Sequence, residues 1–144
     1  MEIDPREEVL YRLKLAIEHL ESAAKRFGVE DWAGVVQASQ LSVENAAKAV
    51  IAHFHVPSWT HDPSGELREI SEELPAALRS EIEKLAEIAS TLAPEHGRAS
   101  YGLPAERITP GRLYDRERAE RSLELARKAL SISRRILARL GYET

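Results

Sequence analysis

Apolar residues recur every three or four positions in four stretches of the chain, a spacing that predicts four amphipathic helices. Asp4 and Asp115 precede the first and the last stretch, where a carboxylate can accept the free N–H groups of a first turn. Gly28 is expected to end the first helix in a left-handed conformation. The expected buried stripe of that helix is Leu10, Leu13, Ile17, Leu20, Ala24 and Phe27.

The segments between the helices differ in length. A short helical turn is expected over residues 66–73, before a third helix that begins at Pro75. Residues 93–113 contain three prolines and three glycines and show no sustained period, so we expect a long loop there. Long helices of similar length predict an all-α fold, an up-and-down bundle of four long helices plus a possible short one, within a single domain of residues 1–144.

The second predicted helix is almost free of charge. It begins after Glu30 or Asp31, and residues 32–52 carry only Glu44 and Lys48 as charged side chains. A helix that is apolar or small on nearly every side is buried on nearly every side, either at the centre of a bundle or at a subunit contact. We therefore predict a homodimer with this helix near the interface.

Composition excludes several classes of protein. There are no cysteines, so disulfide scaffolds and thiolate sites are excluded, and no apolar run is long enough to cross a membrane. The N-terminus is acidic where a signal peptide would be basic, so we expect a cytoplasmic protein. The 20 basic and 24 acidic residues give a net charge of −4, which argues against binding long nucleic acid. Residues 96–144 alone carry 11 bases and 6 acids, a possible docking surface for a phosphate or an acidic partner.

Gln37, Glu44 and Lys48 share one face of the second helix, and Glu44 precedes Lys48 by four residues, the favourable order for an ion pair. The pair is either a structural salt bridge or the wall of a polar pocket. His61 lies in the following loop and would join such a pocket, or it would order the loop beside the Asp62-Pro63 turn.

At these residues the chain resembles the HEPN superfamily. The family pattern Q-x-x-x-E-x-A-x-K-A falls on Gln40–Ala49, and THDPSGEL (Thr60–Leu67) is similar to the loop with a His and then a Leu. HGRASYG (His96–Gly102) resembles the Arg-Tyr loop, and LYDRERAERSLELA (Leu113–Ala126) resembles the start of the closing helix. The chain is similar to minimal stand-alone prokaryotic members, which are related to the C-terminal domain of sacsin.

The resemblance implies a helical bundle that usually dimerises and functions as a metal-independent ribonuclease, a non-catalytic partner of a small nucleotidyltransferase in a toxin–antitoxin or related system, or a nucleotide-binding module. Together with the polar face of the second helix, the resemblance places ligand or partner binding on Gln37, Glu44, Lys48, His61, Arg98 and Tyr101.

The ribonucleases of the family use an Arg and a His separated by four to six residues. No His follows Arg98 within that window, and the formal match, Arg12 with His19, lies in the first helix. The departure favours a protein without catalysis of its own. A degenerate ribonuclease is the alternative, with His61 or His96 as acid/base and Arg98 or Arg112 as the phosphate clamp. A purely structural helical dimer is the third possibility.

Other chemistry has weaker support. His53 and His55 would point about 200° apart on a continuous helix, so they cannot chelate one ion with His61 and Asp62. We predict no metal site and no cofactor.

Overall fold

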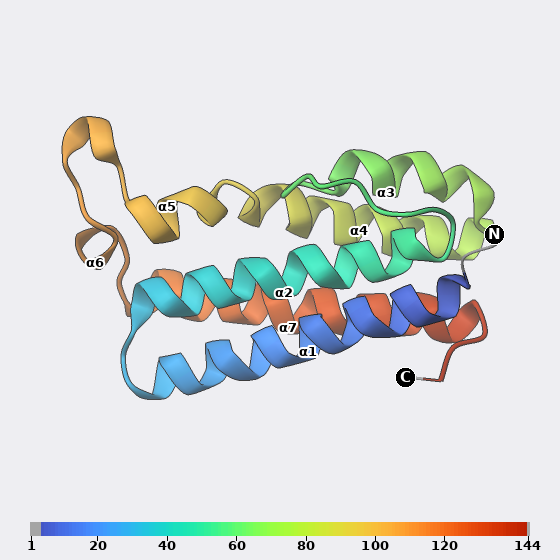
Figure 1. Cartoon of the computed structure of the whole chain (residues 1–144), viewed down its shortest axis with the longest axis horizontal. Coiled ribbons are helices and arrows are strands. Elements are labelled where there is room, and N and C mark those ends of the chain that lie inside the picture. Colours follow the sequence, from blue (N-terminus) through green and yellow to red (C-terminus); the bar gives the residue numbers. More distant parts are fainter. Residues whose placement is uncertain (1–3, 144) are drawn as a thin grey trace.

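The computed structural model describes residues 4–143, which form helices, turns and loops and no strand; one isolated bridge joins Leu103 and Ile108 (Figure 1). The all-α prediction is confirmed. The long helices are α1 (Pro5–Gly28), α2 (Trp32–Ala52), α4 (Ala76–Leu92) and α7 (Arg116–Arg139). The short elements are α3 (Ser64–Ile70), η1 (Ser71–Glu73), α5 (Glu95–Tyr101), η2 (Pro104–Glu106) and α6 (Pro110–Leu113).

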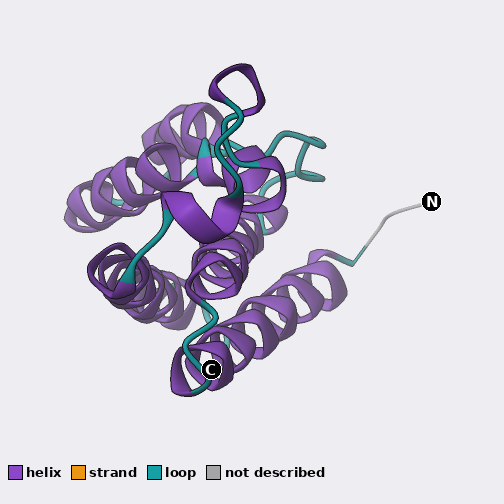
Figure 2. Ribbon diagram, turned by 90° about the vertical axis from the view of Figure 1, so that its left-hand side faces the viewer, coloured by secondary structure: helices purple, strands orange, loops and turns teal. Residues whose placement is uncertain are grey.

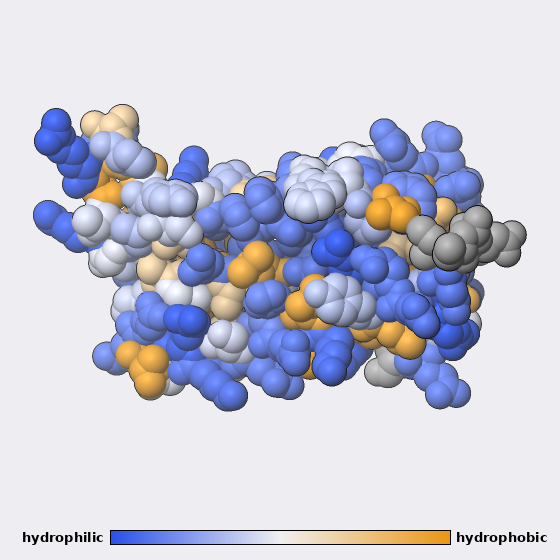
Figure 3. All heavy atoms as spheres, in the orientation of Figure 1, coloured by the Kyte–Doolittle hydropathy of each residue, from blue (hydrophilic) through white to orange (hydrophobic). Residues whose placement is uncertain are grey.

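The long helices lie side by side and run roughly along the viewing direction of Figure 2. The face drawn in Figure 3 is mainly polar, with small scattered apolar patches. Among the helices described, none is both long and apolar enough to cross a lipid bilayer.

Helix starts follow the predicted caps. Asp4 accepts from the backbone N–H of Arg6, Asp31 from that of Gly34, and Asp115 from that of Arg118. The predicted role of Gly28 is wrong: Gly28 is the last helical residue, and Glu30 adopts the left-handed conformation, with φ of 59°.

The predicted buried stripe of α1 is correct in part, because Leu13 is buried and Ile17, Leu20 and Phe27 pack against the core. Leu10 is 41% exposed and Ala24 is exposed, whereas Val9, Leu13, Ala16 and Ala23 are buried. Periodicity alone defines a helix face only to within about one residue. Here the small side chains of Ala16 and Ala23 fill the contact with α2, and the larger leucine next to Val9 faces outward.

Helix α2 occupies the centre of the molecule. Figure 1 shows it between α1 and α7 on one side and α3, α4 and α5 on the other, and 17 of its 21 residues are buried. Helices of the same chain therefore cover the apolar surface of α2 on nearly every side. The homodimer stays a prediction, and the burial of α2 no longer requires it.

The segment 93–113 is not the long loop that its prolines and glycines suggested. It contains three helical pieces. Helix α5 follows Pro94, η2 begins at Pro104 and α6 begins at Pro110. Because each helical piece is only one or two turns long, no apolar period can build up in the sequence. This correction matters for function, because α5 carries His96.

Gly102 ends α5 in a conformation that other residues rarely adopt. Its φ is +68°, and a Cβ atom at this position would collide with the carbonyl oxygen of Ile108. We expect Gly102→Ala to lower the free energy of unfolding by roughly 1–3 kcal/mol, measured by urea denaturation. The control is Gly97→Ala in the same helix, where a Cβ meets nothing and no loss is expected. Equal losses in both variants would contradict this account.

Candidate functional site

The two charged residues of α2 form a buried ion pair. Lys48 Nζ lies 3.2 Å from Glu44 Oε2, and only 4% of Lys48 and 7% of Glu44 are exposed. Burial alone would raise the pKa of the Glu44 carboxyl, but hydrogen bonds from Gln40 and His61 and the charge of Lys48 outweigh burial, and this pKa lies below its ordinary value. The Glu44 side chain is therefore an anion at neutral pH.

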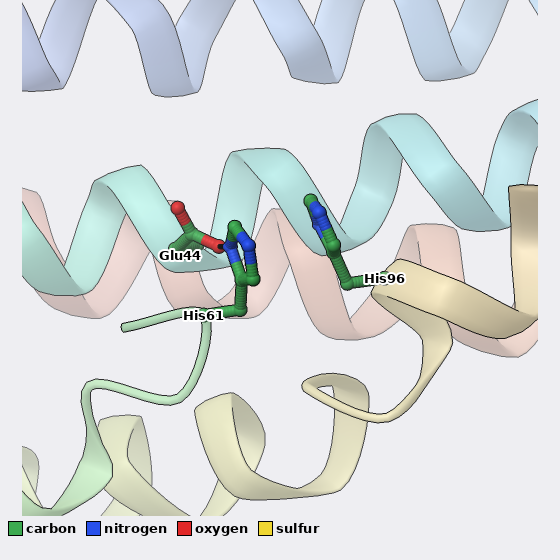
Figure 4. Close-up of side chains that lie close together, drawn as sticks. All are labelled: Glu44, His61 and His96. Atoms are coloured by element: carbon green, nitrogen blue, oxygen red, sulfur yellow. Dashed lines mark hydrogen bonds and ion pairs between the residues drawn. The ribbon is translucent and has the colours of Figure 1, made fainter. Parts of the chain in front are cut away.

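Two histidines from distant parts of the chain meet at this anion. His61, in the loop between α2 and α3, has its Nδ1 atom 2.9 Å from Glu44 Oε1. His96, on α5, has its Nδ1 atom 3.0 Å from Gln40 Oε1. The imidazole rings stack with their centroids 3.6 Å apart and their planes 16° apart (Figure 4). We call Gln40, Glu44, Lys48, His61 and His96 the Glu44 cluster.

The hydrogen-bond partners assign the protons in the cluster. The carboxylate oxygen of Glu44 and the amide oxygen of Gln40 are acceptors, so both imidazoles donate from Nδ1. Gln40 also donates from Nε2 to Glu44 Oε1 at 3.1 Å. In a ring that donates from Nδ1 and holds no second proton, the Nε2 atom carries a lone pair that can accept a proton or bind a ligand.

A groove opens beside the cluster, between α1, α2 and the loop that follows α2. Its volume is about 330 Å³, and it is lined by Arg12, Glu44, Lys48, Val56, Pro57, Ser58, Trp59 and His61. We call it the Arg12 groove. Arg12 is held by Glu8 Oε1 at 2.9 Å and by Asn45 Oδ1 at 3.2 Å. The indole of Trp59 is 97% exposed.

The loop that carries Trp59 and His61 is ordered by local hydrogen bonds. Ser58 donates from its backbone N–H and its hydroxyl to the carboxylate of Glu66 on α3. The backbone N–H of Asp62 donates to Thr60 Oγ1 at 3.0 Å, and Asp62 accepts from the N–H of Ser64 at 3.1 Å. The polar residues of the loop thus fix the position of His61 against α2.

The comparisons with known proteins place this arrangement in a family. The family model for the HEPN domain matches residues 9–136. The chain belongs to the HEPN domain family. Among solved structures, the protein TT1696 from Thermus thermophilus is similar, with a TM-score of 0.70 and 25% sequence identity over 88% of this chain and 96% of that chain. No curated protein matches the sequence.

Three residues of the HEPN helix pattern, Gln40, Glu44 and Lys48, lie in the Glu44 cluster, one turn apart on α2. The sequence pattern places Gln37 on this polar face as well, but Gln37 donates to Ser100 Oγ on α5 at 3.0 Å. The prediction of Gln37 missed Gln40, whose spacing of four residues from Glu44 was the signal in the sequence that would have found it.

The arginine and the tyrosine of the Arg-Tyr loop do not reach the cluster, although His96 at the start of the same segment does. Arg98 lies 3.7 Å from Glu95, which also accepts from the hydroxyl of Tyr114, and Tyr101 is 75% exposed. Within residues 4–143, no hydrogen bond or ion pair joins Arg98 or Tyr101 to His61. Of the predicted site residues, Glu44, Lys48, His61 and His96 converge, and Gln37, Arg98 and Tyr101 lie apart from them.

Arg12 and His19, the formal Arg/His match of the sequence, line different cavities. His19 lines another cavity together with Arg26 and Gln37, where burial lowers the pKa of its imidazole. Arg12 instead shares its groove with His61, 49 positions away in the sequence. No sequence pattern indicates this pairing or the place of Trp59, because both depend on how the loop after α2 folds back along α2 (Figure 1).

The other histidines do not join the cluster. His53 Nδ1 lies 2.8 Å from the hydroxyl of Tyr142, and His55 Nδ1 lies 3.9 Å from Glu66.

The positive charge of the last third of the chain is partly neutralised, since Arg135 on α7 pairs with Glu81 on α4 at 3.0 Å.

Proposed function

We propose that this HEPN protein is a non-catalytic module that binds a nucleotide through its phosphate groups in the Arg12 groove. The supporting observation is that Arg12, Lys48 and His61 line one groove although they come from α1, α2 and a loop. A guanidinium offers a planar pair of donors that matches phosphate oxygens, and the ammonium of Lys48 adds a further donor.

The rest of the groove suits the other parts of a nucleotide. Its volume of about 330 Å³ falls within the range of small-molecule sites. Trp59 presents an exposed indole at the same groove, and an aromatic face can stack on a nucleobase whatever its identity. Nearby Glu8 and Asn45 already orient Arg12, which lowers the entropy lost on binding.

Titration calorimetry with ATP, ADP and AMP tests the proposal. Loss of one charge-assisted contact costs about 1.5–3 kcal/mol, so Arg12→Gln is expected to weaken binding by roughly 10- to 100-fold. Trp59→Ala is expected to lower the affinity for nucleotides more than the affinity for inorganic pyrophosphate, because only a nucleotide has a base that can stack on the indole.

Arg26→Gln is the matched control. Arg26 also lies on α1 and pairs with an acid, Asp31 at 2.9 Å, but it does not line the groove. It should bind like the parent protein. Absence of saturable binding by the parent, or equal weakening in both arginine variants, would contradict the proposal.

A second candidate is a degenerate metal-independent ribonuclease. The observation that favours it is the shared groove of Arg12 and His61, with His96 stacked on His61. His61 would act as acid/base and Arg12 as a clamp on the phosphorane charge. RNA cleavage in EDTA that is lost in His61→Ala would support this candidate against the non-catalytic proposal.

The partner predictions from the resemblance belong to the same proposal. A nucleotidyltransferase-like protein encoded by a neighbouring gene would be tested by co-purification of the two chains. The homodimer would be tested by light scattering at high protein concentration, where a monomer would exclude it. Both measurements are independent of nucleotide affinity.

A further inference from the structure

The Glu44 cluster brings together three side chains of the types that bind transition metals. Glu44 comes from α2, His61 from the loop after it and His96 from α5 (Figure 4). One ligand atom from each of the three lies within 4.8 Å of the others. We propose that Glu44, His61 and His96 form a binding site for a divalent transition-metal ion such as Zn²⁺.

The spacing of two ligand atoms is already that of a coordination sphere. His61 Nδ1 and Glu44 Oε1 are 2.9 Å apart. Two adjacent ligands at right angles, each about 2.1 Å from an ion, are separated by about 3 Å. A metal ion on Nδ1 would take the place of the proton that these two atoms now share, and the imidazole would carry that proton on Nε2 instead. His96 completes the set, because one of its ring nitrogens lies within 4.8 Å of the ligand atoms of Glu44 and His61. The two rings are stacked with their centroids 3.6 Å apart, so a ring must turn out of the parallel arrangement for both nitrogens to face one ion.

Neighbouring residues hold the ligands in place. Lys48 occupies Glu44 Oε2, which leaves Oε1 directed at the histidines. Gln40 donates to Glu44 and accepts from His96, so a single side chain orients two ligands. Outer partners of this kind are typical of metal sites, where they fix the orientation of histidine rings and carboxylates.

The donor set selects the class of metal. Two imidazoles and one carboxylate suit Zn²⁺, Co²⁺, Ni²⁺ or Fe²⁺, whereas Mg²⁺ and Ca²⁺ prefer oxygen ligands. The His61 side chain is 54% exposed, so the remaining coordination positions would open to solvent. The site shares Glu44 and His61 with the Arg12 groove, but His96 is not among the residues that line the groove, so the two proposals can be tested apart.

Cobalt absorption provides the test. The full chain is dialysed against EDTA, freed of chelator and titrated with Co²⁺, whose visible bands report coordination by nitrogen and oxygen ligands. We expect saturation at one ion per chain, displacement by Zn²⁺ and no displacement by Mg²⁺. His61→Ala and His96→Ala are each expected to weaken binding at least 10-fold, whereas Gln40→Leu should weaken it roughly 10- to 100-fold through the ligand orientation alone.

His55→Ala is the control, because His55 is exposed and lies outside the cluster. No saturable cobalt spectrum, or one that His96→Ala leaves unchanged, would overturn the proposal. Arg12→Gln separates the two proposals: it should lose nucleotide affinity and keep the cobalt spectrum, whereas His96→Ala should do the reverse. Circular dichroism of each variant checks that it is folded.

Discussion

Replacing Lys48 with methionine is expected to lower the free energy of unfolding by about 3–5 kcal/mol at pH 7. The substitution leaves the Glu44 carboxylate, which is only 7% exposed, without its counter-charge inside the bundle. Gln40 and His61 still donate to Oε1, but neither replaces the ammonium at Oε2. Urea denaturation followed by circular dichroism measures the loss.

The double variant, with Glu44→Leu and Lys48→Met, is the control for this prediction. Removing both charges also removes the cost of burying them, so its stability should return to within about 1 kcal/mol of the parent. If the double variant loses as much as Lys48→Met, shape rather than charge explains the effect. The double variant also tests the structural-dimer alternative, because a pair that only stabilises the fold can be replaced without loss of any binding activity.

Acid conditions provide a second check on the same pair. The pKa of Glu44 in the folded protein lies below its ordinary value of 4.5, so the unfolded chain takes up a proton first as the pH falls. The contribution of ionised Glu44 to stability is therefore complete above about pH 4.5 and is lost as the pH falls through the lower folded value. The difference in unfolding free energy between the parent and Glu44→Gln should shrink accordingly below that pH.

Replacing Leu13 with alanine is expected to cost about 2–5 kcal/mol, because Leu13 is 5% exposed and its removal leaves a cavity between α1 and the core. Leu10→Ala, at the position one turn earlier on α1, should cost less than about 1 kcal/mol, since Leu10 is 41% exposed. The same chemical change in the same helix thus has two different expected effects. Similar losses from both variants would show that α1 packs on the stripe expected from periodicity, rather than on the face centred on Val9 and Leu13.

The fold was largely predictable from local features. Apolar spacing, the caps at Asp4, at Glu30 or Asp31 and at Asp115, and the long stretch of α2 with only two charged residues correctly predicted four long helices and a central or covered second helix. The errors concern features that local pattern does not control. Which face of α1 is buried depends on which of its side chains fit against α2. The short helix α5 is held by contacts with α2.

The candidate site divides in the same way. Gln40, Glu44 and Lys48 follow each other at four-residue intervals, so their common helix face, and the ion pair between the last two, follow from helix geometry alone. The meeting of His61 with His96 and of Arg12 with Trp59 depends on contacts between residues far apart in the chain, which no local rule specifies. The sequence by itself determined the helices, their caps and the buried ion pair, because these depend on neighbours within one or two turns. Only the tertiary structure decided which histidines and which arginine meet that pair, because packing α1, the loop after α2 and α5 against α2 sets those distances.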